Sequence, residues 1–95
     1  MRPRWTRSAL ADLETIGDHV ARDNPPAAQR LVARIAAAAD ALGDHPYVGK
    51  PGRMTGTREL VVADTPYIVP YRVRGDEVEI LAVFHGSRRW PDTFG

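Results

Sequence analysis

The chain has 95 residues, with 13 basic and 12 acidic side chains, a formal net charge of +1 and no cysteine. This length predicts a single domain over residues 1–95 with a small core, and the lack of cysteine excludes disulfides and thiolate metal sites and favours a cytoplasmic location. The balanced charge gives no argument for nucleic-acid binding, and no segment has the roughly 18 apolar residues of a membrane span, so no membrane partner is expected.

Residues 9–42 are predicted to form two helices joined by a short turn. Apolar residues of the first helix recur at three- and four-residue spacing: Leu10, Leu13, Ile16 and Val20. Ser8 is its expected N-cap. Asn24 and Pro25 suit the N-cap and first turn of the second helix, and Gly43 its end. A connection this short predicts an antiparallel hairpin.

Beyond residue 43 the apolar pattern changes from helix-like to strand-like. The segment HPYVGKPGRMTG is rich in glycine and proline and predicts a loop. Strands are predicted for three runs rich in valine, isoleucine and tyrosine: TRELVVA, PYIVPYRV and EVEILAVFH. Residues 4–6 are expected to add an edge strand. The predicted fold is therefore α+β, an N-terminal antiparallel helical hairpin packed on a small, mostly antiparallel three- to four-stranded sheet.

A two-residue turn at Gly75 and Asp76 sets the register of the last two strands. Glycine in the first position suits a type II′ turn. The turn places Arg72 opposite Glu79 and Ile68 opposite Val83, with His85 at the far end of the same side. The other side is almost wholly apolar and is expected to lie under the helices: Tyr67, Val69, Tyr71, Val73, Val78, Ile80, Ala82 and Phe84.

Three segments of the chain together carry a resemblance to a known family: ALADLETIGDHVARDNPPAAQRLVARI, GTRELVVADTPYIVPYRV and VEILAVFHGSRRWP. In this order and at this length the chain resembles the RelE/ParE superfamily of bacterial toxins. The resemblance implies a type II toxin that inhibits growth when free of its cognate antitoxin and that forms a hetero-oligomer with it. It also implies one of two targets, because RelE-like members cut messenger RNA on the ribosome and ParE-like members bind DNA gyrase.

Metal-independent RNA cleavage needs an acid, a base and a cation on the developing phosphorane. The candidates are His85 as acid or base, with Arg88 and Arg58 as phosphate clamps. Arg72 is expected to be occupied by Glu79, whereas Arg58 is expected to be freer. The three histidines are far apart in sequence, so neither a metal nor another cofactor is expected.

Two departures favour the ParE-like reading. RelE-like nucleases that resemble this chain place an arginine where Ile68 stands, and their lysine-rich loop is missing, since Lys50 is the only lysine. Binding of DNA gyrase is thus the leading hypothesis, with ribosome-dependent cleavage of messenger RNA as the alternative. A non-toxic protein-interaction module is the third.

The arginines carry a separate hint of binding. Twelve of the 13 basic residues are arginine, a side chain that grips carboxylate or phosphate as a planar fork, although a GC-rich genome gives the same bias. Arg88, Arg89 and Trp90 are of the residue types that dominate binding hot spots. This end of the chain is therefore predicted to meet the target or the antitoxin.

Overall fold

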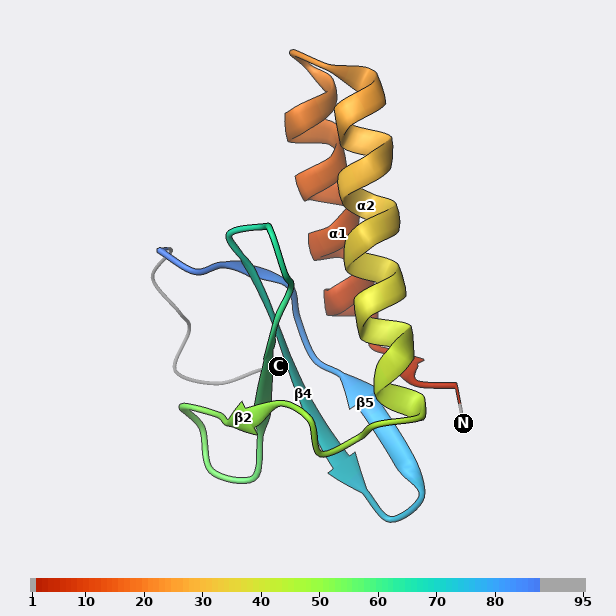
Figure 1. The fold of residues 1–95 in the computed structure, drawn as a ribbon, viewed down its shortest axis with the longest axis vertical. Coiled ribbons are helices and arrows are strands. Elements are labelled where there is room, and N and C mark those ends of the chain that lie inside the picture. Colours follow the sequence, from red (N-terminus) through yellow and green to blue (C-terminus); the bar gives the residue numbers. More distant parts are fainter. Residues whose placement is uncertain (1, 88–95) are drawn as a thin grey trace.

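A computed structural model describes residues 2–87 as two helices laid across one face of a twisted sheet (Figure 1). The elements in chain order are β1 (Arg4–Trp5), α1 (Arg7–Ala21), α2 (Pro25–Asp40), a 3₁₀ turn (Ala41–Gly43), β2 (Lys50–Pro51), β3 (Arg58–Val61), β4 (Tyr67–Arg74), β5 (Glu77–Ile80) and β6 (Phe84–His85). The predicted α+β fold is confirmed. The sheet has more short strands than the three or four expected, because β2 forms inside the segment predicted as loop.

The sheet is antiparallel except at one edge. Its strand order is β1-β5-β4-β3-β2, and β6 also pairs with β4. The expected edge strand at the start of the chain is confirmed as β1, which runs parallel to β5 and places Arg4 beside Glu79.

Side-chain caps fix where both helices begin. Thr6, not Ser8, is the N-cap of α1: its hydroxyl oxygen accepts the N–H of Ala9 at 3.1 Å, and the hydroxyl donates to the carbonyl of Leu81. Ser8 was wrong as the cap because the helix already begins at Arg7. The cap at Asn24 is confirmed, with its side chain accepting from Ala27 and proline at the first helical position.

The core lies between the helices and one face of the sheet. Its fully buried apolar side chains come from both layers: Ala9, Ile35, Ala39, Leu42, Val62, Val69, Tyr71, Val78, Ile80 and Val83. The two helices touch closely at Gly17, where an added Cβ would lie 2.9 Å from Val32. The helices are thus held to the sheet by the apolar side of β4 and β5, as the register predicts.

The tight turn between β4 and β5 confirms the first half of that register. Gly75 has a φ of +60°, which a type II′ turn requires at its first position. Arg72 lies opposite Glu79, and Tyr71 lies opposite Ile80 on the helix side.

Beyond Ile80 the pairing shifts by one residue, which corrects the prediction for His85. Ile68 lies opposite Phe84 instead of Val83, and Tyr67 lies opposite His85. Two residues of the last segment therefore face one residue of β4, which is a β-bulge. His85 consequently shares the helix side with Tyr67, and Phe84 shares the other side with Ile68, the reverse of what was predicted for both.

A helix side chain stabilises this bulge. The N–H of Val83, which has no partner in the strand ladder, donates to Oδ2 of Asp12 at 3.0 Å. The carboxylate on α1 thereby satisfies a donor that the extra residue would leave unpaired. Beyond the bulge the ladder resumes, and Gly86 donates to the carbonyl of Pro66 at 2.7 Å.

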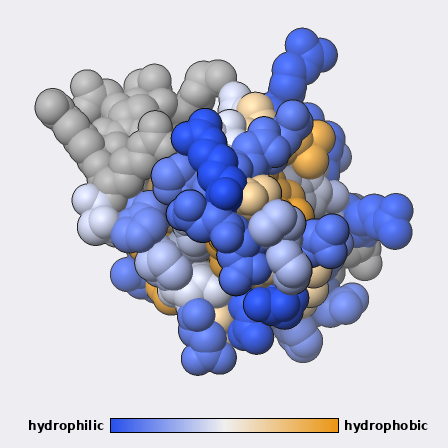
Figure 2. Space-filling view, turned by 90° about the horizontal axis from the view of Figure 1, so that it is seen from above, coloured by the Kyte–Doolittle hydropathy of each residue, from blue (hydrophilic) through white to orange (hydrophobic). Residues whose placement is uncertain are grey.

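The far half of the helical hairpin extends past the end of the sheet (Figure 1). Seen from that end, its surface is mainly hydrophilic with small apolar areas (Figure 2). Across residues 2–87, neither helix is long and apolar enough to cross a bilayer.

Candidate functional site

His85 lies exposed at the end of β6 with its ring held in place by two neighbours. Nδ1 accepts the backbone N–H of Ser87 at 3.2 Å and lies 2.8 Å from the Ser87 hydroxyl oxygen. The Tyr67 ring meets it edge-on, with 5.5 Å between ring centroids. Because Nδ1 acts as an acceptor, the neutral ring carries its proton on Nε2. Within residues 2–87 no carboxylate forms a salt bridge with this histidine.

Within residues 2–87 Arg58 forms no salt bridge, so it is freer of carboxylates than Arg72, as expected, but its guanidinium is held by the loop that follows the helices. Its Nη1 donates to two backbone carbonyls, of Gly49 at 2.8 Å and of Tyr47 at 3.2 Å. The guanidinium carbon also lies 5.1 Å from the centre of the Tyr47 ring, within cation–π range.

Tyr71 anchors the same loop from beneath. Its hydroxyl donates to the carbonyl of Pro46 at 2.8 Å and accepts the N–H of Gly49 at 2.9 Å. Burial raises the pKa of this phenol above its ordinary value of 10.0, against smaller lowering effects from the Gly49 hydrogen bond and the Arg58 charge.

Tyr71→Phe is expected to lower the free energy of unfolding at neutral pH by about 1.5 kcal/mol, because a half-buried carbonyl and a buried N–H lose their partner. Because the pKa of Tyr71 is raised in the folded state, the extra stability that tyrosine gives over phenylalanine is lost at high pH. The unfolded state loses the phenol proton first, so the stability gained from Tyr71 is complete below pH 10 and declines as the pH rises through the higher folded pKa.

Urea unfolding of both proteins between pH 7 and 11 measures that difference. We expect the gap between wild type and Tyr71→Phe to narrow above pH 10. A gap that stays constant or widens over that range would contradict the assignment.

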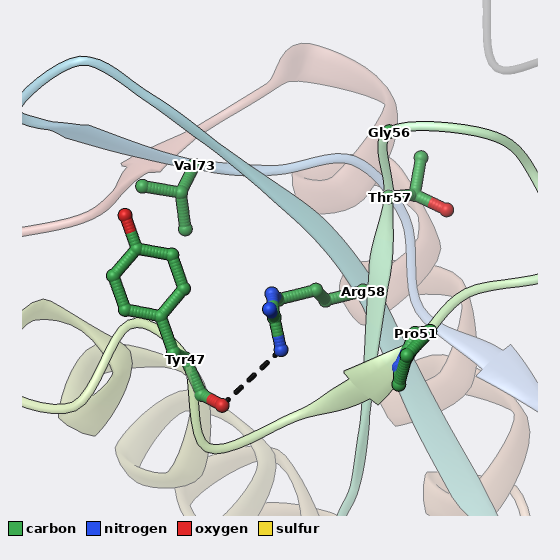
Figure 3. Close-up of a pocket in the computed structure, with 6 residues that line it drawn as sticks. All are labelled: Tyr47, Pro51, Gly56, Thr57, Arg58 and Val73. Carbon is green, nitrogen blue, oxygen red and sulfur yellow. Dashed lines mark hydrogen bonds between the residues drawn. The ribbon is translucent and has the colours of Figure 1, made fainter.

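Arg58 and Tyr47 belong to a shallow surface pocket next to the sheet (Figure 3). The cavity volume is about 220 Å³. Its lining comes from the loop, from β2 to β4 and from the turn before β3: Tyr47, Pro51, Gly56, Thr57, Arg58 and Val73. In Figure 3 the guanidinium lies between Tyr47 on one side and Pro51 and Thr57 on the other. The sequence predicted Arg58 as a candidate residue but not the pocket. It did indicate the Gly- and Pro-rich loop that supplies Tyr47 and Pro51.

The structure does not bring His85 and Arg58 together. Arg58 is paired with Tyr71 and His85 with Tyr67, so they lie four residues apart along β4. β3 and β6 pair with opposite edges of β4. The backbones of Arg58 and His85 are therefore separated by about 13 Å along β4 and about 10 Å across it. These two residues are therefore not positioned to act on one phosphate.

On the other side of the sheet, arginines pair with a buried carboxylate. Arg72 Nε lies 2.6 Å from Oε1 of Glu79, which confirms the expected pair, and Arg4 contacts the other carboxylate oxygen. Further along this side Ile68 lies between Val61 and Phe84, an apolar row. Both cross-strand neighbours of Ile68 are thus apolar.

The remaining candidates fall outside this geometry. Arg88, Arg89 and Trp90 lie outside the described residues, so their predicted roles stay predictions. Among residues 2–87, no three histidine or acidic side chains are grouped so as to hold a metal ion.

Fold and site together define a small α+β protein with an arginine-centred surface pocket and with its candidate acid–base residue apart from that arginine. The family model for the ParE toxin of the type II toxin–antitoxin system parDE matches residues 4–90. The chain therefore belongs to the ParE family and is a ParE-type toxin of a type II toxin–antitoxin system, with a cognate antitoxin as its partner.

The chain is also similar to other proteins described as toxins and to a solved toxin–antitoxin structure. The chain is 54% identical over 90 residues to the putative toxin Y4kP of Sinorhizobium fredii, covering 95% of this chain and 93% of the relative. It is 42% identical over 84 residues to the toxin RelE2 of Caulobacter vibrioides, covering 88% and 93%. A solved structure of the chromosomal ParDE system from P. aeruginosa superposes with a TM-score of 0.82 at 33% identity, covering 90% of this chain and 95% of the other.

Proposed function

We propose that this toxin inhibits growth by binding DNA gyrase, and not by cutting messenger RNA. The observation that carries the proposal is the separation of His85 from Arg58, the two described residues that cleavage would require together. His85 lies opposite Tyr67, whereas Arg58 lies opposite Tyr71, four residues further along β4 and on its other edge. The Arg58 guanidinium is also bonded to loop carbonyls.

A second feature supports the same conclusion. The apolar row of Val61, Ile68 and Phe84 offers no cation to a phosphorane, since its members lie opposite one another on neighbouring strands. Phosphoryl chemistry without a metal depends on such cations. A toxin that acts by binding its target has no such requirement.

A supercoiling assay with purified DNA gyrase and relaxed plasmid tests this proposal. We expect the purified chain to block supercoiling in a concentration-dependent way and the toxin–antitoxin complex to leave supercoiling intact. In a translating extract the chain should leave transcripts uncut. Unchanged supercoiling together with cut transcripts would overturn the proposal in favour of the ribosome, and loss of cutting in His85→Ala would then place His85 in the site.

Expression of the chain alone separates both targets from the third hypothesis. A gyrase-binding toxin should arrest growth, and co-expression of the antitoxin should restore it. Normal growth at high levels of folded protein would indicate a non-toxic interaction module instead.

A further inference from the structure

The pocket in Figure 3 holds a half-buried cation that has no acidic partner within the chain's described part. Arg58 is excluded from a pair with the adjacent Glu59 because neighbouring strand residues point to opposite faces. Glu59 is buried on the other face and accepts the N–H of Arg53 at 2.8 Å. Within residues 2–87 the charge of Arg58 is therefore compensated by two backbone carbonyls and the Tyr47 ring, and by no carboxylate.

The way Arg58 is held leaves one edge of its guanidinium available. Both carbonyl bonds use Nη1, and neither Nε nor Nη2 forms a hydrogen bond within residues 2–87. Nε and Nη2 together form the side-on edge that binds the two oxygens of a carboxylate. The carbonyl bonds and the Tyr47 ring fix the plane of this edge, so little side-chain entropy remains to be lost on binding.

The pocket fits one side chain better than a nucleotide. Its volume of about 220 Å³ is below the range of about 300–1,000 Å³ that small-molecule sites occupy. Among the described residues Arg58 is the only charged one in the lining, whereas a nucleic-acid backbone is bound by several cations along its track.

The rim of the pocket resembles a protein interface. Tyr47 and Val48 are 64% and 65% exposed, two large apolar side chains in succession. Tyrosine and arginine are also the residue types that most often dominate the energetics of protein interfaces. An acidic side chain flanked by apolar ones would complement both the cation and this rim.

We propose that the pocket formed by Tyr47, Arg58 and Val73 receives one aspartate or glutamate side chain of the cognate antitoxin, bound side-on by Nε and Nη2 of Arg58. The proposal rests on the toxin–antitoxin pairing and is independent of the gyrase target. A negative result in the supercoiling assay would leave it standing, and its own failure would leave gyrase binding standing.

A double-mutant cycle with the antitoxin encoded beside this chain tests the contact. Each Asp and Glu of the antitoxin is changed in turn to the amide, and the Kd of each variant is measured for wild-type toxin and for Arg58→Gln. Arg58→Gln should weaken binding of the unchanged antitoxin about 10- to 100-fold. One acidic position should cause a similar loss with wild-type toxin and less than about a twofold loss with Arg58→Gln.

This coupling separates recognition from a merely structural role, since a disturbed loop would weaken all antitoxin variants alike. Arg58→Lys, which keeps the charge without the fork, should lose about 3- to 10-fold and serves for the cycle if Arg58→Gln does not fold. Arg74→Gln, an exposed arginine on β4, is the matched control and should stay within about twofold of wild type. Tight binding by Arg58→Gln, or the absence of any acidic position coupled to Arg58, would overturn the proposal.

Discussion

Gly49→Ala is expected to lower the free energy of unfolding by about 3 kcal/mol and the Tm by about 15 °C. An added Cβ would lie 2.6 Å from the Tyr71 hydroxyl oxygen, 2.7 Å from Cε1 of the same ring and 2.9 Å from the carbonyl oxygen of Glu59. Tyr71 is fully buried and has no room to retreat, and the Glu59 oxygen belongs to the backbone of β3. Relief of the overlap would therefore displace the loop and break its hydrogen bonds to Tyr71.

Thermal unfolding of three variants checks this explanation. If the overlap with the hydroxyl is the main cause, the double variant Gly49→Ala, Tyr71→Phe should lose less stability than the two single changes added together. If the double variant loses as much stability as the two single changes added together, the cost of Gly49→Ala arises elsewhere in the loop. A Tm for Gly49→Ala within about 2 °C of wild type would contradict the close packing itself.

Features encoded by neighbouring residues were predictable from the sequence. Asn24 followed by Pro25 predicts where α2 begins because capping is a contact within one helical turn. Gly75 and Asp76 predict the register of β4 and β5 because a two-residue turn determines which residues lie opposite each other. The apolar side of that hairpin then indicates which face the helices cover.

The bulge could not be predicted in the same way. Its unpaired N–H at Val83 is satisfied by Asp12, 71 positions earlier in the chain, so no local pattern reports it. A one-residue insertion reverses the facing of every later side chain in the strand. The bulge therefore places His85 on the helix side and Phe84 on the other side, and the contact with Asp12 stabilises it.

The candidate site was predicted only in part for a related reason. Arg58 was identified as a cation on the correct strand, but its partners are carbonyls at residues 47 and 49. Every residue has a backbone carbonyl, so the sequence cannot indicate which carbonyl a side chain will bind. The loop is placed by Tyr71, whose hydroxyl reaches Pro46 and Gly49 from the middle of the sheet.

The second large effect on stability concerns Glu79 and its two arginines. Removing the arginines is expected to cost more than removing the carboxylate. Its side chain is 7% exposed, whereas those of Arg72 and Arg4 are 38% and 54% exposed. After Glu79→Gln both arginines can still reach water, so we expect a loss of about 1 kcal/mol. The double change Arg4→Gln, Arg72→Gln leaves a buried carboxylate without a cation and should cost about 3 kcal/mol.

Urea unfolding at pH 7 measures this asymmetry, with Arg74→Gln as the control for removing an exposed arginine from the same strand. We expect Arg74→Gln to stay within about 0.5 kcal/mol of wild type. Adding Glu79→Gln to the double arginine variant should then restore part of the lost stability, because the buried charge is removed together with its partners. If that triple variant is less stable than the double variant, Glu79 has a further stabilising partner, and the two arginines do not account for its burial.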